Sequence, residues 1–269
     1  MMKRLLAILC VLLPLAACVG QKDDPEPDPD PVVTPDDPEP EPEPDPGPEG
    51  NGAFLRHSLV LDFTGTWCVN CPGMQAAIAE ASAQRPGLII PVAVHYMDKM
   101  AVKPLGTDLA ARFGVSAYPS AVVDLDASTL MTIASAELIL SYCDKLLESR
   151  YPAAGVQIES TLDDGQVSAT VEAYLMRDGD YSIHLLLLED GIVASQTGAG
   201  ADYVHNDVLR AWLDGQEQFD GKGKGDVISA SFSLEAAEGM RLVAMVCRDG
   251  IVENVISCTA GGHIGYEYE

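Results

Sequence analysis

The sequence predicts an α/β domain followed by an all-β domain, preceded by a segment that does not fold. Between residues 53 and 152, apolar runs typical of strands alternate with segments of helical periodicity. From residue 153 to residue 269, short segments alternate apolar and polar residues and are separated by turn-forming Asp-Gly pairs. Residues 23–49 contain little but Pro, Asp and Glu, a composition that buries too little apolar surface to fold.

The first 17 residues have the pattern of a signal peptide. Lys3 and Arg4 precede an apolar run that is too short to span a bilayer. The run ends in Leu-Ala-Ala followed by Cys18, which resembles the lipobox of bacterial lipoproteins. The resemblance implies cleavage before Cys18, acylation of this residue and anchorage of the chain in a lipid bilayer. The alternative is an ordinary signal peptide that is cleaved near a cysteine.

Residues 18–52 form the predicted spacer, and they carry much of the negative charge. The whole chain has 41 acidic and 16 basic residues, for a net charge of −25. Residues 51–269 keep 29 acidic and 13 basic residues, so the folded part is also strongly acidic. Such a surface repels phosphate groups, which excludes nucleic acid and anionic membrane surfaces as partners. The stretched spacer reaches up to about 90 Å at a polyproline-like rise per residue.

Three strands and three helices are predicted for residues 53–152. Strands are expected at 59–63, 88–94 and 121–125, where apolar residues form short continuous runs. Helices are expected at 71–84, 108–113 and 136–149, where apolar residues recur at helical spacing.

A pair of cysteines, Cys68 and Cys71, stands at the start of the first predicted helix. The unpaired N–H groups and the dipole at a helix N-terminus favour a thiolate over a thiol. Cys68 is therefore expected to be the exposed nucleophile that attacks protein thiols or disulfides, and Cys71 to resolve the mixed disulfide. The alternatives are a structural disulfide and half of a zinc site. No second pair with this spacing exists, so we expect neither a metal nor a cofactor.

The residues around this pair resemble the thioredoxin superfamily. Trp67 to Cys71 is similar to the family's active-site loop, and Asp62 precedes Cys68 by six residues. The resemblance implies a thioredoxin-like fold for residues 53–152, with Asp62 moving protons and Pro119 as a cis-proline packed against the sulfurs. Val69 and Asn70 replace the family's usual Gly-Pro, which leaves the direction of electron flow open.

Residues 153–269 are predicted to form an immunoglobulin-like β-sandwich, because short strands follow one another without helices. The strands are expected at 156–159, 166–176, 181–188, 227–234, 240–247 and 252–258. A turn at 249–250 would place Cys247 opposite Val252, so a disulfide between Cys247 and Cys258 needs another register; two buried thiols are the alternative. A polar cluster is either a loop with satisfied hydrogen bonds or a ligand or metal site; it comprises Asp202, His205, Asn206 and Asp207.

Residues 53–269 as a whole resemble the twenty-eight-kilodalton outer-membrane protein family of bacterial lipoproteins. The resemblance rests on the segments 62–72, 189–194 and 203–210. It implies a lipid-anchored protein of the outer membrane, on its periplasmic or its cell-surface face. Two functions follow from the residues: a thiol–disulfide oxidoreductase acting on exported proteins, or a surface binding or adhesion protein in which the first domain is a scaffold for a protein ligand.

Overall fold

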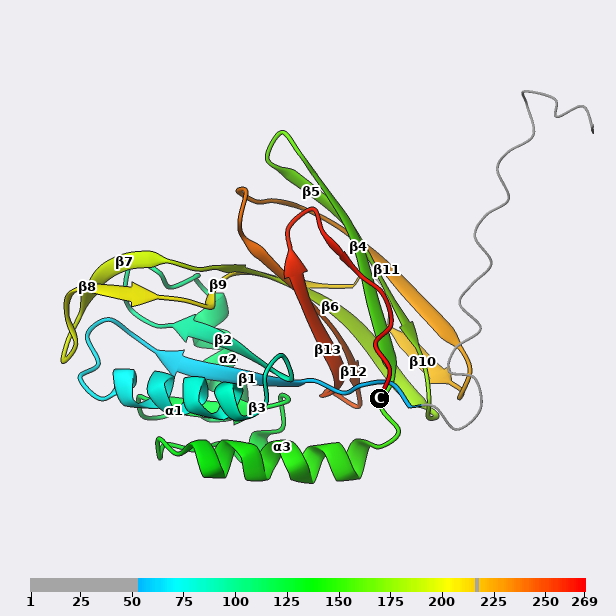
Figure 1. Ribbon diagram of the computed structural model, residues 1–269, viewed down its shortest axis with the longest axis horizontal. Coiled ribbons are helices and arrows are strands. Elements are labelled where there is room, and N and C mark those ends of the chain that lie inside the picture. Colours follow the sequence, from blue (N-terminus) through cyan, green and yellow to red (C-terminus); the bar gives the residue numbers. More distant parts are fainter. Residues whose placement is uncertain (1–52, 216–217) are drawn as a thin grey trace, which may run out of the picture. The chain divides into compact units, whose positions relative to one another are not determined.

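The computed structural model describes residues 53–215 and 218–269 (Figure 1). The predicted signal peptide, Cys18 and the whole predicted spacer lie outside these residues. None of the helices within the described ranges has the length and apolar character that a bilayer-spanning segment needs.

An eight-stranded sheet contains strands from both regions of the described chain. Seven of its strands are neighbours in the order β13 (Ile251–Thr259), β12 (Arg241–Arg248), β6 (Gly179–Glu189), β9 (Val208–Asp214), β2 (Ile89–His95), β1 (Ser58–Thr64) and β3 (Ser120–Val123). The eighth strand, β10 (Phe219–Lys222), pairs with β6. The parallel pairing of β2 with β9 joins the two regions that the sequence assigned to separate domains.

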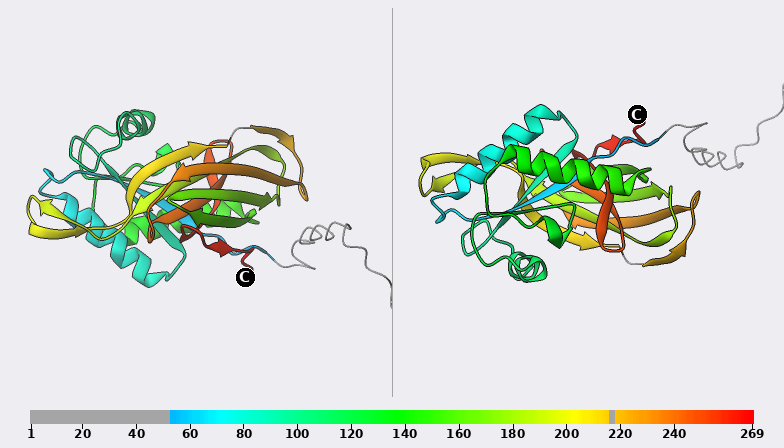
Figure 2. Two further views of the ribbon diagram at one scale, coloured as in Figure 1. Left: turned by 90° about the horizontal axis from the view of Figure 1, so that it is seen from above. Right: turned by 90° about the horizontal axis from the view of Figure 1, so that it is seen from below.

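Two helices, α1 (Cys71–Gln84) and α3 (Ala136–Arg150), lie side by side on one face of β1, β2 and β3 (Figure 2). The side chain of Ser135 caps α3 by accepting a hydrogen bond from the backbone of Leu138 at 3.2 Å. The opposite face packs against α2 (Leu105–Phe113), which ends at Gly114 in the left-handed conformation. A short 3-10 helix (Ala127–Thr129) follows β3.

A second sheet has four strands in the order β11 (Val227–Glu235), β5 (Gln166–Tyr174), β4 (Gly155–Asp163) and β14 (His263–Ile264). Buried and exposed residues alternate along β5, because one face covers the core and the other meets water. This sheet packs over β6 and β12 and forms an apolar cluster with them. A separate two-stranded hairpin consists of β7 (Ile192–Gln196) and β8 (Gly200–His205).

The central strands β6 and β12 are buried on both faces. Leu185 and Leu187 face the four-stranded sheet, whereas Leu186 and Leu188 face a cluster that also contains Leu61 of β1 and residues of α2. The predicted fold class, a thioredoxin-like α/β domain followed by an immunoglobulin-like β-sandwich, is therefore wrong. The described chain is mostly β, and its two regions share one sheet and one apolar cluster.

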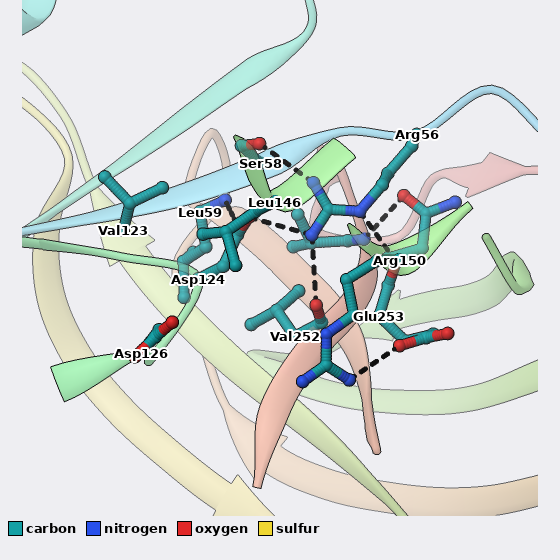
Figure 3. Close-up of polar contacts among 12 residues, drawn as sticks. Arg56, Ser58, Leu59, Val123, Asp124, Asp126, Leu146, Arg150, Val252 and Glu253 are labelled. Carbon is teal, nitrogen blue, oxygen red and sulfur yellow. Dashed lines mark hydrogen bonds and ion pairs between the residues drawn. The ribbon is translucent and has the colours of Figure 1, made fainter. Parts of the chain in front are cut away.

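A buried ion network also ties the two regions together (Figure 3). Arg56 forms an ion pair with Asp124 at 2.8 Å, and both side chains are almost fully enclosed. The same guanidinium donates to the backbone carbonyls of Val252 and Glu253 at 3.0 and 3.1 Å. The Glu253 side chain in turn accepts a hydrogen bond from Arg150 at the end of α3. Because each buried charge has a partner, the network fixes β13 against the segment that leads into β1.

Candidate functional site

The two cysteines of the predicted motif form a disulfide where α1 begins. Cys68 and Cys71 are bonded, and Pro72 occupies the first turn of the helix without disturbing it. Cys71 is fully buried, as expected for the inner cysteine, but Cys68 is only 5% exposed. The predicted exposure of Cys68 is therefore wrong for the oxidised protein, and its role as a nucleophile stays a prediction.

The loop that contains the disulfide carries an exposed aromatic surface. Trp67 is 46% exposed, and its indole N–H donates to the carbonyl of Tyr96 at 2.8 Å. The Trp67 ring meets the edge of the Tyr118 ring, which stacks on Tyr96 with ring centroids 5.3 Å apart. Val69 and Met97 are 59% and 70% exposed. These five residues are called the aromatic patch below, and the ring contacts together with the hydrogen bond from Trp67 hold its three rings in place.

Asp62 lies on β1, upstream of the disulfide loop, and is only 2% exposed. No hydrogen bond of acceptable geometry reaches either carboxyl oxygen, although the Gln75 amide lies close enough to favour the charged form. Burial, and then the charge of Asp207, raises the pKa of Asp62 to about 8. Asp62 therefore holds a proton at neutral pH.

Pro119 lies beside the end of β1 from which the disulfide loop leaves. The antiparallel pairing of β1 with β3 sets Ser120 opposite Phe63, so the preceding proline reaches the level of that loop. The bond between Tyr118 and Pro119 is cis, as the resemblance implies, and Pro119 is buried. Of the predicted site residues, the structure thus brings Asp62, Trp67, both cysteines and Pro119 to one end of the sheet, and Cys18 lies outside the described residues.

The hairpin β7–β8 covers the disulfide loop. This cover was not predicted from the sequence. Gln196 donates through its side-chain amide to the carbonyl of Cys68 at 2.8 Å and to that of Gly65 at 3.3 Å. The backbone N–H of Thr197 donates to the carbonyl of Thr66 at 2.8 Å. At the tip, Gly198 has a φ of +86°, and a Cβ there would lie 2.7 Å from the carbonyl oxygen of Val69. The two glycines at 198 and 200, which favour a tight turn, were the available signal in the sequence.

A buried polar group lies where β8 meets β2. His95 shares a hydrogen bond of 2.7 Å with Asp98, and its ring lies 5.4 Å from that of His205. His205 is fully buried with neither ring nitrogen hydrogen-bonded, and burial lowers its pKa, followed by the effect of His95. Burial alone would raise the pKa of Asp98, but the hydrogen bond from His95 holds it below its ordinary value. Both histidines are thus enclosed in the protein interior.

Within the polar cluster at 202–207, Asn206 and Asp207 have partners, whereas the ring nitrogens of His205 have none among the described residues. Asn206 accepts a hydrogen bond from the backbone of Gly191 at 2.9 Å, and Asp207 forms an ion pair with Arg241. Nearby, Arg210 forms an ion pair with Glu189 at 2.6 Å. Within the described ranges, no group of three or more His, Cys, Asp or Glu side chains is arranged to hold a metal ion.

The three remaining cysteines of the described chain are free thiols. Cys143 and Cys247 are buried, and Cys258 is partly exposed. Cys247 lies opposite Val252, which confirms the register predicted from the turn. Burial raises the pKa values of Cys143 and Cys258 to about 11 and that of Cys247 to about 12. None of them is activated for thiol chemistry.

Comparisons with known proteins link the chain to one family. The family model of outer membrane protein Omp28 matches residues 107–262. Among solved structures, HBP35 of Porphyromonas gingivalis is similar, with a TM-score of 0.62, 19% identity and coverage of 78% of this chain and 76% of that chain. A protein from Agrobacterium tumefaciens is similar with a TM-score of 0.50, 14% identity and coverage of 76% and 93%. These likenesses show a shared fold alone. None of the curated proteins matches the chain.

Proposed function

The chain belongs to the Omp28 family of outer membrane proteins, and we propose that it acts in that membrane as a surface binding protein for polypeptides. The aromatic patch carries the proposal. Half-exposed aromatic side chains with few rotatable bonds lose little entropy on binding, and such residues dominate the affinity of protein interfaces. Trp67, Tyr96 and Tyr118 are already held in place by mutual ring contacts and a hydrogen bond, so the patch is ordered before it meets a partner.

The partner proposed for the patch is an extended, apolar polypeptide segment. Val69 and Met97 border the rings with exposed apolar side chains, and methionine adapts to partners of different shape. On this proposal, the disulfide and the hairpin β7–β8 are supports. The bond closes the loop that presents Trp67 and Val69, and Gln196 anchors the same loop through two backbone carbonyls.

The test measures binding of a permanently unfolded protein, reduced and carboxymethylated lactalbumin labelled with fluorescein, by fluorescence anisotropy. Trp67→Ala should weaken binding by about tenfold or more, the effect of removing a central interface residue. Tyr151→Ala is the matched control, because Tyr151 is equally exposed (48%) but follows α3. Unchanged binding by the Trp67 variant would contradict the proposal.

A second candidate function is thiol–disulfide exchange, which the buried Asp62 favours. A carboxyl group that keeps its proton at neutral pH stands on the strand leading into the disulfide loop. In such an exchange, two thiols of a partner would be oxidised to a disulfide while Cys68 and Cys71 take up the two electrons and two protons. The enclosure of Cys68 opposes this candidate, because an attacking thiolate must reach its sulfur.

One pair of variants separates the two candidates. Replacing Cys68 and Cys71 together with Ser should leave lactalbumin binding within about threefold of the wild-type value if the disulfide only supports the loop. Replacing Cys71 alone with Ser should trap mixed disulfides on Cys68 in cells only if exchange occurs. Trapped partners on the Cys71 variant would favour exchange, and their absence would favour a supporting role for the disulfide.

The anchor and the membrane face are also part of the proposal. Acylated Cys18 would hold the protein in the outer membrane, with the patch presented on the cell surface at the end of the acidic spacer. Cys18→Ser should release the protein from the membrane fraction, because the acidic chain has no other affinity for lipid. Protease treatment of intact cells checks the face: a surface protein is digested, and a periplasmic one is protected.

A further inference from the structure

A cavity of about 410 Å³ lies between the outer side of α1 and strand β8. Its walls include the small side chains of Ala76 and Ala79, both exposed on α1. Tyr203 of β8 closes one side, and its hydroxyl donates to the Gln75 side chain at 2.5 Å. The volume is that of a site for a small molecule.

The ionisable acids that line this cavity are two carboxyl groups, beside the uncharged polar side chains of Gln75, Tyr203 and Asn206. Asp62 and Asp207 both line it, and none of the lining residues is Lys, Arg or His. Asp207 already has a partner in Arg241, whereas Asp62 is 2% exposed and neither of its oxygens has a hydrogen bond of acceptable geometry. The nearby Gln75 amide favours the ionised form of Asp62, but the effect of burial outweighs it, so a ligand that brings a further donor and a positive charge would stabilise the carboxylate.

We propose that this cavity binds a small primary amine whose ammonium group donates to Asp62 and whose alkyl body packs against Ala76 and Ala79. The site lies apart from the aromatic patch, and the proposal does not depend on the proposed function. A neutral alcohol would supply a donor without the charge, and a carboxylate would add a third negative group beside two others. The order of affinity is therefore amine, then alcohol, then carboxylate.

The affinity for the amine should rise with pH. Burial and the charge of Asp207 keep Asp62 protonated up to a pKa of about 8, and the ammonium group binds the ionised form. At pH 6 the amine must first displace this proton, whereas at pH 8.5 most of the carboxyl group is already ionised. The other titratable or charged groups around Asp62 are Tyr203 and Asp207; Asp207 is paired with Arg241, which also forms an ion pair with Asp190.

The experiment titrates the full chain, purified in detergent, with n-butylamine, n-butanol and butyrate by isothermal titration calorimetry at pH 6 and pH 8.5. At pH 8.5 butylamine should bind at least about tenfold more tightly than butanol, and its affinity should fall about tenfold or more at pH 6. Nα-acetyl-lysine amide identifies the source of the ammonium: if it binds, the site accepts a lysine side chain, and if only butylamine binds, the site takes a free amine.

Three variants complete the test. Asp62→Asn should weaken amine binding about tenfold and abolish its pH dependence, whereas Asp202→Asn, an exposed acid on the same hairpin, should change neither. Ala76→Leu fills the cavity from the exposed face of α1, where folding tolerates a larger side chain, and should abolish binding even if the Asp62 variant does not fold. Equal binding of butanol and butylamine, or undiminished binding by the Ala76 variant, would overturn the proposal.

Discussion

The shared core predicts that a single substitution in β6 destabilises both regions of the chain at once. Leu186 is fully buried, lies opposite Val243 of β12 and Trp212 of β9, and belongs to the cluster that includes Leu61 of β1. Leu186→Ala leaves a cavity that strands fixed on both sides cannot close, so the free energy of unfolding should fall by about 3–5 kcal/mol. With a urea dependence of about 2 kcal/mol per molar, the urea midpoint should fall by about 1.5–2.5 M.

The two tryptophans of the chain provide the assay, because each reports on one region. Trp212→Phe leaves Trp67 in the disulfide loop as the fluorophore, and Trp67→Phe leaves Trp212 in β9. In both backgrounds Leu186→Ala should shift the urea midpoint by the same amount, while Val193→Ala, at an exposed hairpin position, should shift neither. If the Trp212 midpoint falls and the Trp67 midpoint stays, the regions unfold independently and the reasoning is refuted.

Three further predictions follow from burial and charge. Arg56→Ala should lower the free energy of unfolding by about 3–5 kcal/mol, because it leaves the buried carboxylate of Asp124 without its partner. Arg210→Ala, in a partly exposed ion pair, should change this free energy by less than about 1 kcal/mol in the same urea assay. Asp62 has a folded-state pKa of about 8 against an ordinary 3.8, so the folded chain holds a proton that the unfolded chain releases. The free energy of unfolding should therefore fall as pH rises from about 4 to 8, by up to about 1.4 kcal/mol per pH unit, and Asp62→Asn should remove this slope. Among the free thiols, iodoacetamide at pH 8 should label the partly exposed Cys258 before the fully buried Cys247, as followed by peptide mass spectrometry; the reverse order would contradict the burial described for them.

Local elements could be predicted from the sequence because their signals are local. The predicted helix at 71–84 coincides with α1, and the expected strands of the second region coincide with β4, β5, β6, β11, β12 and β13 to within a few residues. Helical spacing, Asp-Gly turns and a serine cap act over four to ten residues, which a single sequence displays directly.

The joining of the two regions could not be predicted from element patterns, but one signal was present. Residues 185–188 are four consecutive leucines, and a strand with one solvated face would alternate instead. A continuous apolar run means that both faces are covered, so β6 required a second packing partner beyond the sandwich. The partner is the layer formed by β1, β2 and α2, which is remote in sequence.

The candidate site was predicted only in part. The motif identified Asp62, Trp67, Cys68, Cys71 and Pro119, which do lie at one end of the sheet. The exposure of Cys68 was predicted incorrectly, because the exposure of a loop depends on what folds over it. That cover comes from β7 and β8, and no local pattern around the cysteines reveals it.

The cysteine loop precedes the covering hairpin in the sequence, and this order affects when the two thiols are accessible. Gln196 follows Cys68 by 128 residues, so an exported chain delivers the cysteine loop well before the segment that closes over it. An oxidising enzyme therefore meets both thiols on an incomplete chain, and docking of the hairpin ends that period of access. Once docked, the hairpin limits the access of reductants to the disulfide, because Gln196 and Thr197 close over its loop.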